Sequence, residues 1–172
     1  MTTLQLRYDP DPLLRQKTRR VRNIDADLLK LVDGMIDTMH AEKGVGLAAN
    51  QVGVPLRVAV IQISEEDEPI VLINPKMIRR EGEREITEGC LSIPGYQGIV
   101  KRSLKVRVRA TDISGNEFRI RAEGNILAQA LEHELGHLNG ELYIDPMNLV
   151  EGQHEIVAER LREVLLDAAS GI

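Results

Sequence analysis

The sequence predicts an α+β protein with one domain over residues 1–172. Apolar residues recur at helical spacing near both ends of the chain, whereas the middle holds short β-branched runs separated by turns. The length is sufficient for a sizeable core. Aromatic side chains are scarce, with three Tyr, one Phe and no Trp. We therefore expect a core of Leu, Ile, Val, Ala and Met.

Composition excludes several classes of protein. The net charge of −5 gives no overall case for nucleic-acid binding. One cysteine excludes an internal disulfide and fits a reducing compartment. No stretch approaches the ~20 apolar residues of a membrane span, and residues 1–14 lack an apolar run of signal-peptide length. We expect a cytoplasmic protein without a membrane partner.

The first fifty residues predict two helical segments and a tight turn. Asp11 and Pro12 are typical of a helix cap and a first helical position, which predicts a short helical turn. A longer helix is predicted over residues 25–42, where apolar residues form one stripe. We expect Met35 and Met39 in this stripe to fill the core rather than to form a binding surface. The residues at 44–55 are mostly small and end in a turn, and Gly44 and Gly46 allow a backbone or ligand to approach closely.

Strands are predicted through the middle of the chain. The runs 56–63 and 70–74 are apolar, and Pro75 should end the second. A polar edge strand is predicted over 77–84, and residues 99–111 alternate between apolar and basic side chains. A turn at 114–116 should lead to a partner strand. We interpret the basic residues as the solvated face of a sheet rather than an RNA site, because interleaved aromatics are missing.

The pattern His-Glu-x-x-His at residues 133–137 carries the chemistry. Asn125 is a plausible cap and Gly140 a plausible stop for a helix that contains it. In a helix His133 and His137 lie one turn apart on one face, where both can reach one metal ion. Glu134 lies beside them and can handle the protons of a water activated by the metal. A final helix is predicted over residues 153–169.

Two histidines leave a metal ion short of ligands, since a catalytic site has a third protein ligand and an open position. The third ligand could be a downstream His or Glu, as in many metallopeptidases, or Cys90. Cys90 lies in a segment framed by Gly and Pro, read as a shaped loop, which favours it over His40 and His154. Two alternatives to a catalytic Cys site stay open: a metallopeptidase, and a non-catalytic metal-binding or redox-sensing module.

Three segments in order, 44–51, 88–92 and 133–137, together resemble the peptide deformylase family. The resemblance implies antiparallel sheets around a central His-Glu-x-x-His helix, followed by a C-terminal helix. It implies one metal ion held by Cys90, His133 and His137, typically Fe(II), with Zn, Ni or Co as substitutes. The implied reaction removes the N-formyl group from the formyl-methionine of nascent polypeptides and releases formate.

The resemblance also implies roles for other residues. Glu134 would take a proton from water and deliver it to the leaving amine. The Gln51 side-chain amide and the Leu91 backbone N–H would stabilise the oxyanion. Backbone groups of Gly46 and Gly89 would bind a peptide as an extra strand. The implied methionine pocket is lined by Val45, Gly46, Ile126, Gln129 and Ala130.

Two residues depart from the family pattern, and a third, Gln129, places a polar group beside the implied pocket. Gly136 stands where an acidic residue is usual, and Gln97 stands where many members carry Arg. Some members dock on the ribosome through a C-terminal extension, so transient ribosome association is an expectation. Residues 140–172 hold seven acidic side chains against two Arg, so we expect no direct nucleic-acid binding by this segment.

Overall fold

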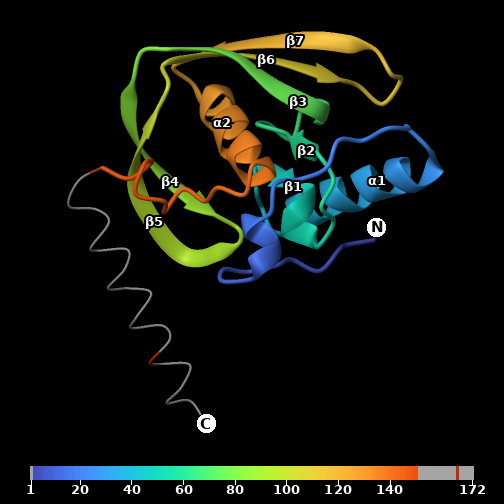
Figure 1. Ribbon diagram of the computed structural model, residues 1–172, viewed down its shortest axis with the longest axis horizontal. Helices are drawn as coiled ribbons and strands as arrows, with labels where there is room; N and C mark the ends of the chain where they lie inside the picture. Colours follow the sequence, from blue (N-terminus) through green and yellow to red (C-terminus); the bar gives the residue numbers. More distant parts are fainter. Residues whose placement is uncertain (1, 151–165, 167–172) are drawn as a thin grey trace.

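The structure, a computed structural model, describes residues 2–150 and 166 and is organised around one central helix (Figure 1). This helix, α2 (Ile126–Leu138), contacts both a five-stranded and a two-stranded sheet. The other elements, in chain order, are the 3-10 helix η1 (Pro12–Arg15), α1 (Ala26–Ala41), β1 (Gly46–Ala48), the 3-10 helix η2 (Ala49–Val52), β2 (Val58–Ile61), β3 (Ile70–Glu81), β4 (Arg84–Cys90), β5 (Ile93–Arg102), β6 (Lys105–Thr111) and β7 (Glu117–Glu123).

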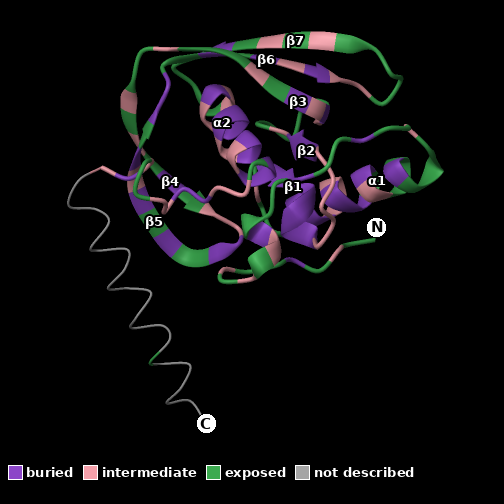
Figure 2. Cartoon of the chain, in the orientation of Figure 1, coloured by how far each residue is buried: buried purple, intermediate pink, exposed green. Residues whose placement is uncertain are grey.

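Both sheets are antiparallel, which confirms the predicted α+β class. The larger sheet has the order β1-β2-β3-β6-β7, and β4 pairs with β5 in the smaller one. Successive side chains of a strand point to opposite faces. In β2, Ala59 and Ile61 therefore pack with α2, whereas Val58 and Val60 pack with α1. The larger sheet is thus covered on both faces at β2, and Figure 2 shows α2 largely buried.

The helix boundaries follow from the caps that the sequence predicts. Asp25 accepts a hydrogen bond from Leu28 N at 2.9 Å and begins α1, close to the predicted range 25–42. Met35 and Met39 are fully buried, so the core interpretation of these methionines is confirmed. Asp11 caps η1 through Leu13 N, with Pro12 at the first helical position.

Pro75 does not end a strand, and the separate edge strand predicted over 77–84 is wrong. Strand β3 runs through Pro75 and pairs with both β2 and β6. The register shifts between Ile73 and Lys76, and Asn74 has a φ of 50°. At such an irregularity the missing N–H of proline removes no hydrogen bond from the ladder.

The predicted strand 99–111 divides between the two sheets. β5 ends at Arg102 and β6 begins at Lys105, so Leu104 lies at the corner and is 36% exposed instead of facing the core. The corner is fixed by Glu132 of α2, which accepts a hydrogen bond from Ser103 N at 2.6 Å. The predicted hairpin turn is confirmed, since Gly115 has a φ of 85° between β6 and β7.

The helix predicted over 153–169 lies outside the described residues. Within residues 2–150 and 166, no helix has the length and apolar character needed to cross a membrane.

Candidate metal centre and active site

Most of the predicted site residues line one cavity of about 670 Å³ between α2, β1 and β4. His137 is the exception, because it is buried and does not line the cavity. The predicted residues that line the cavity are Val45, Gly46, Gln51, Gly89, Cys90, Leu91, Ile126, Gln129, Ala130, His133 and Glu134.

Helix α2 places the two histidines on one face. Asn125 accepts a hydrogen bond from Ala128 N at 2.9 Å and begins the helix, and Gly140, with a φ of 79°, follows its end. Both predicted boundaries are therefore confirmed. The rings of His133 and His137 lie edge to face, with centroids 4.7 Å apart. One turn of helix thus brings both Nε2 atoms to the same point.

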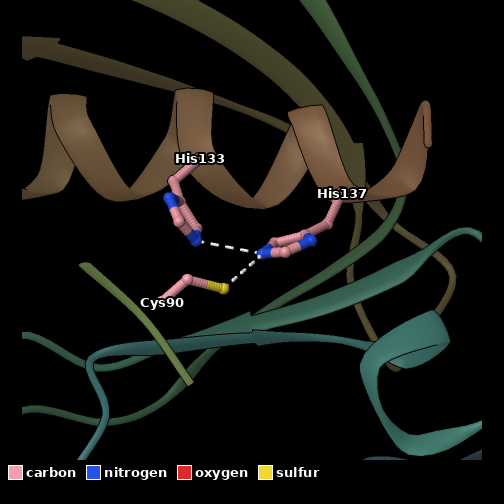
Figure 3. Close-up of side chains that lie close together, drawn as sticks. All are labelled: Cys90, His133 and His137. Carbon is pink, nitrogen blue, oxygen red and sulfur yellow. Dashed lines mark hydrogen bonds between the residues drawn. The ribbon is translucent and has the colours of Figure 1, made fainter. Parts of the chain in front are cut away.

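Cys90 completes a group of three converging donor atoms (Figure 3). Its Sγ lies 3.2 Å from His137 Nε2, which lies 3.0 Å from His133 Nε2. All three atoms lie within 4.8 Å of one another. A transition metal with bonds of about 2.0 to 2.3 Å to N and S fits among them. Two imidazole nitrogens 3.0 Å apart need a proton or a cation between them, because their lone pairs would otherwise repel each other.

The sequence predicted a loop around Cys90, but this residue lies at the end of strand β4. Glu88 lies two residues earlier on the same strand and therefore points to the same side. It accepts a hydrogen bond from His133 Nδ1 at 2.6 Å. This bond fixes the proton on Nδ1 and leaves the Nε2 lone pair directed at the metal position.

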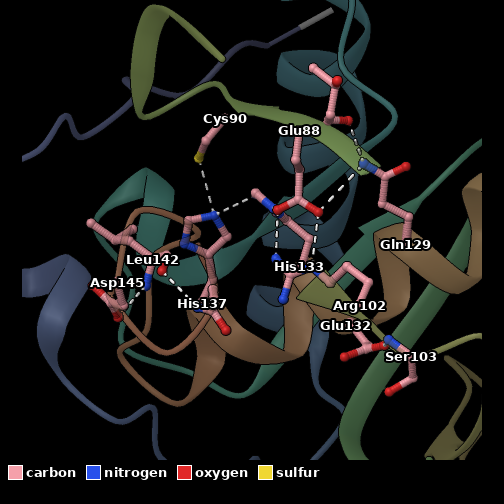
Figure 4. Close-up of polar contacts among 12 residues, drawn as sticks. Glu88, Cys90, Arg102, Ser103, Gln129, Glu132, His133, His137, Leu142 and Asp145 are labelled. Atoms are coloured by element: carbon pink, nitrogen blue, oxygen red, sulfur yellow. Dashed lines mark hydrogen bonds and ion pairs between the residues drawn. The ribbon is translucent and has the colours of Figure 1, made fainter. Parts of the chain in front are cut away.

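Glu88 and Arg102 form a buried pair behind His133 (Figure 4). Arg102 Nε and a terminal guanidinium nitrogen donate to the two carboxylate oxygens at 2.9 and 2.5 Å. Burial alone would raise the pKa of Glu88, but the hydrogen bonds from His133 and Arg102 lower it to about 2. Sequence reasoning assigned neither residue a role. Glu88 and Cys90 are two residues apart, so in a strand their side chains share one face. The interpretation of this segment as a loop left that relation unused.

Burial and neighbouring groups set the protonation of the histidines. Desolvation lowers the pKa of His137 well below its ordinary value, so its imidazole is neutral, as a metal ligand must be. Desolvation also acts to lower the pKa of His133, but hydrogen bonds with Cys90 and Glu88 raise it well above the ordinary value. A metal ion therefore competes with a proton at His133 Nε2.

Glu134 lies buried beside the donor group. Its Oε2 has no hydrogen-bond partner among residues 2–150, and burial raises the pKa of its carboxyl to about 7. Gly46 of β1 faces this carboxylate, and a Cβ at position 46 would lie 2.5 Å from Glu134 Oε1. The close approach expected at Gly46 is therefore an approach to Glu134. A carboxyl group with this pKa can exchange protons near neutral pH.

The Gln51 amide is held in the site by two bonds at opposite ends. Its Oε1 accepts from Ala48 N at 2.9 Å, and its Nε2 donates to Ser92 Oγ at 3.1 Å. The same Nε2 lies 3.7 Å from Cys90 Sγ. Leu91 follows Cys90 in the turn between β4 and β5. Ser92, which sequence reasoning missed, orients the amide nitrogen toward the donor group.

The pocket residues differ in exposure. Ala130 is buried, whereas Val45 and Ile126 are 43% and 53% exposed, so Ile126 is not an ordinary core residue. Gln129 donates to Thr87 O at 3.2 Å and to Glu88 Oε1 at 3.4 Å. Its amide therefore joins α2 to β4. Gly89 and the exposed Gln97 line the same cavity.

Gly136 leaves a space in α2 that faces an acidic side chain. A Cβ at this position would lie 3.7 Å from Glu141 Oε2, which is ordinary contact. The backbone N–H of Glu141 also donates to Gly136 O at 2.9 Å. A carboxylate from the loop that follows the helix therefore lies next to this position.

Two histidines and a buried carboxylate on one helix, facing a thiol at a strand end, form the arrangement of a metal-dependent hydrolase. A family model described as polypeptide deformylase matches residues 3–153. The chain belongs to the peptide deformylase family.

Relatives and solved structures agree with this assignment. A peptide deformylase of Dehalococcoides mccartyi is 46% identical over 159 residues, covering 90% of this chain and 95% of the relative. A peptide deformylase structure from Legionella pneumophila has a TM-score of 0.88 and 39% identity, covering 98% of both chains. One from Synechococcus elongatus, in complex with actinonin, has a TM-score of 0.84 and 39% identity, covering 90% of this chain and 84% of that chain. The chain is therefore an enzyme of a metal-dependent family that deformylates nascent polypeptides.

Proposed function

We propose that Cys90, His133 and His137 hold one divalent metal ion and that the surrounding residues cleave the formyl group from N-formyl-methionyl peptides. The observation that carries the proposal is the convergence of the three donor atoms within 4.8 Å of one another, with Cys90 and His133 lining the cavity. Fe(II) is the proposed native ion, with Zn, Ni or Co as substitutes, because a thiolate ligand softens the site. Exposure of such a thiolate to oxidants would inactivate the enzyme.

The metal ion, when bound, acts as a Lewis acid and lowers the pKa of the attacking water. Glu134 is placed to remove the proton from this water, because its carboxylate is buried next to His133 and faces the cavity. The same carboxyl then delivers the proton to the amine that leaves. A pKa of about 7 suits both transfers, since the group is neither a strong acid nor a strong base near neutral pH.

The oxyanion of the tetrahedral intermediate needs donors that are already oriented. Gln51 Nε2 is proposed as one donor, because its position 3.1 Å from Ser92 Oγ and 3.7 Å from Cys90 Sγ directs it at the metal position. The backbone N–H of Leu91 is proposed as the second. Each donor contributes about 3 kcal/mol to stabilisation of the transition state.

The substrate methionine is proposed to enter the cavity over Ala130, between the exposed apolar side chains of Val45 and Ile126. The aliphatic part of Gln129 completes the wall, since its amide is turned toward Thr87 and Glu88. The peptide backbone would then lie between Gly46 and Gly89, as an added strand. Backbone approach is easy there because neither residue has a side chain.

We also propose that residues 1–172 act as one catalytic domain in the cytoplasm. Nascent polypeptides are the substrates of the family, so transient association with the ribosome is part of the proposal.

The alternative functions make different demands on the site. A metallopeptidase would use a third His or Glu, but the third donor beside the two Nε2 atoms is Cys90 Sγ, and Glu88 is bonded to His133 Nδ1 and to Arg102 instead. A closed, non-catalytic site would need four protein donors. Among the described residues the group has three, which leaves a position for water.

The decisive test is formate release from a formyl-Met peptide by anaerobically purified protein. Loading with Fe, Ni or Co should give turnover, and failure with all three despite bound metal would refute the proposal. Glu134→Ala should retain the metal and lose about 10²- to 10⁴-fold in kcat. Cys90→Ala should lose metal; a Cys90→Ala protein that keeps both metal and activity would favour the metallopeptidase.

A further inference from the structure

The outer face of β3, β6 and β7 carries rows of cations that the strand register brings together. Arg107 lies opposite Arg79 on one side and Arg121 on the other. The next row places Arg109 between Lys76 and Arg119. Residues directly opposite each other in antiparallel strands point to the same face. Six cationic side chains therefore occupy two adjacent rows of one sheet face.

This face is on the far side of the sheet from α2. The alternate residues Val106 and Val108 are buried against the helix, whereas Arg107, Arg119 and Arg121 are exposed. Figure 1 shows β6 and β7 at the edge of the molecule, with α2 beneath them. A ligand on this face would leave the catalytic cavity, which lies between α2, β1 and β4, open to a peptide.

Acidic residues neutralise only part of this charge. Arg79 pairs with Glu81, Lys105 with Glu123 at 3.2 Å, and Arg109 with Glu117 at 3.0 Å. Lys76, Arg107, Arg119 and Arg121 have no ion pair with the described residues. Like charges directly opposite one another destabilise a sheet, and an anionic ligand on the face would relieve this repulsion.

The shape and spacing of the face fit a chain of phosphates. A shallow hollow of about 400 Å³ lies at one end of the face, where its charged lining residues are four cations and two glutamates: Arg79, Lys105, Arg107, Arg121, Glu81 and Glu123. Neighbouring cations repeat about 4.8 Å apart across strands and about 6.8 Å apart along them. Five of the six cations are arginines, and a planar guanidinium binds phosphate oxygens bidentately.

We propose that this cationic face, formed by Lys76, Arg79, Arg107, Arg109, Arg119 and Arg121, docks on the phosphate backbone of RNA. RNA is the partner that fits, because its closely spaced phosphates complement two adjacent rows of cations; this choice rests on the ribosome association proposed above. Contacts to phosphates carry no sequence information, so the binding is independent of base sequence. The sequence alone favours a solvated sheet face. The strand register shows in addition that the cations lie side by side in two rows, and that four of them have no ion pair with the described residues.

The test is fluorescence anisotropy of a short labelled RNA hairpin, titrated with metal-loaded enzyme at several salt concentrations. Four unpaired cations predict a slope of log K against log salt of about −3, so affinity should fall roughly 50- to 150-fold between about 50 and 200 mM salt. The triple variant Arg107→Gln/Arg119→Gln/Arg121→Gln should lose at least about tenfold in affinity at low salt and most of this slope.

A control variant with the same net charge as the triple variant separates the effect of this face from the effect of total charge. The variant Arg19→Gln/Arg20→Gln/Arg22→Gln removes three exposed arginines from outside the face and should bind RNA as the wild type does. Formate release from a formyl-Met peptide should be unchanged in both variants, which verifies folding. Equal loss in the two variants would overturn the proposal in favour of net charge. Tighter binding to phosphatidylserine vesicles than to RNA would overturn the choice of partner, and salt-independent binding would overturn the phosphate contacts.

Discussion

Replacing Gly46 by alanine tests whether the position of Glu134 controls catalysis. The added Cβ would lie 2.5 Å from Glu134 Oε1 and 3.0 Å from both Cδ and Cγ. Rotation of the carboxylate alone cannot relieve all three contacts. Ordinary contact begins at 3.4 Å, so the carboxylate must move by about 0.9 Å. The side chain is only 4% exposed, which leaves little room for this movement without repacking.

A misplacement of about 1 Å costs roughly 10²-fold in rate, which corresponds to about 2.7 kcal/mol of the activation barrier. We therefore expect Gly46→Ala to lower kcat about 10²-fold while the metal content stays complete, because the substitution touches none of the three donor side chains. The backbone groups of residue 46 are retained, so KM should change less than kcat.

The assay is steady-state formate release, with metal content measured on the same preparations. Glu134→Ala gives the lower limit, because it removes the carboxylate altogether. Gly136→Ala is the matched glycine control, since its Cβ would meet only Glu141 atoms at 3.7 to 3.8 Å. If Gly46→Ala retained kcat within about twofold while Glu134→Ala was inactive, the argument from carboxylate position would be refuted.

Three further predictions concern the surroundings of the metal centre and the helix that carries it. Glu88→Gln should weaken metal binding about 10- to 100-fold in a chelator competition, because His133 loses its anionic partner, and the unpaired Arg102 should cost about 3 to 5 kcal/mol of stability. The exposed Glu85→Gln on the same strand should change neither quantity, and an equal effect there would contradict the role of Glu88. Gly136→Ala should raise the melting temperature by about 2 to 4 °C, since alanine gains up to about 1 kcal/mol over glycine inside a helix; a lower value would mean that the space is needed. Asn125→Ala should destabilise the fold by about 1 kcal/mol in denaturant titration, because Ala128 N loses its cap; no change would show that the cap is dispensable.

Local rules predicted η1, α1 and α2 well. Caps and apolar periodicity are properties of neighbouring residues, so Asp25 and Asn125 marked helix starts within one residue of those observed. The spacing of His133 and His137 fixed their shared face, because helix geometry does not depend on the rest of the fold.

The strands were harder to predict, because pairing partners lie far apart in the sequence. Pro75 was expected to end a strand, but a register irregularity against β6 accommodates it. Residues 99–111 alternate as one strand would, yet Ser103 is held by Glu132 of α2 and the chain passes there from one sheet to the other. No local pattern records that contact.

By itself the sequence determined the donor types, the helix that carries two of them and, through its resemblance to peptide deformylase, the expected third donor at Cys90. Only the tertiary structure decided what surrounds them: Glu88 and Arg102 behind His133, Gly46 against Glu134, and Ser92 beside Gln51. The physical reason is one of range. Helical spacing is set within a few residues, whereas burial, hydrogen-bond partners and the resulting pKa values arise only when distant strands pack against that helix.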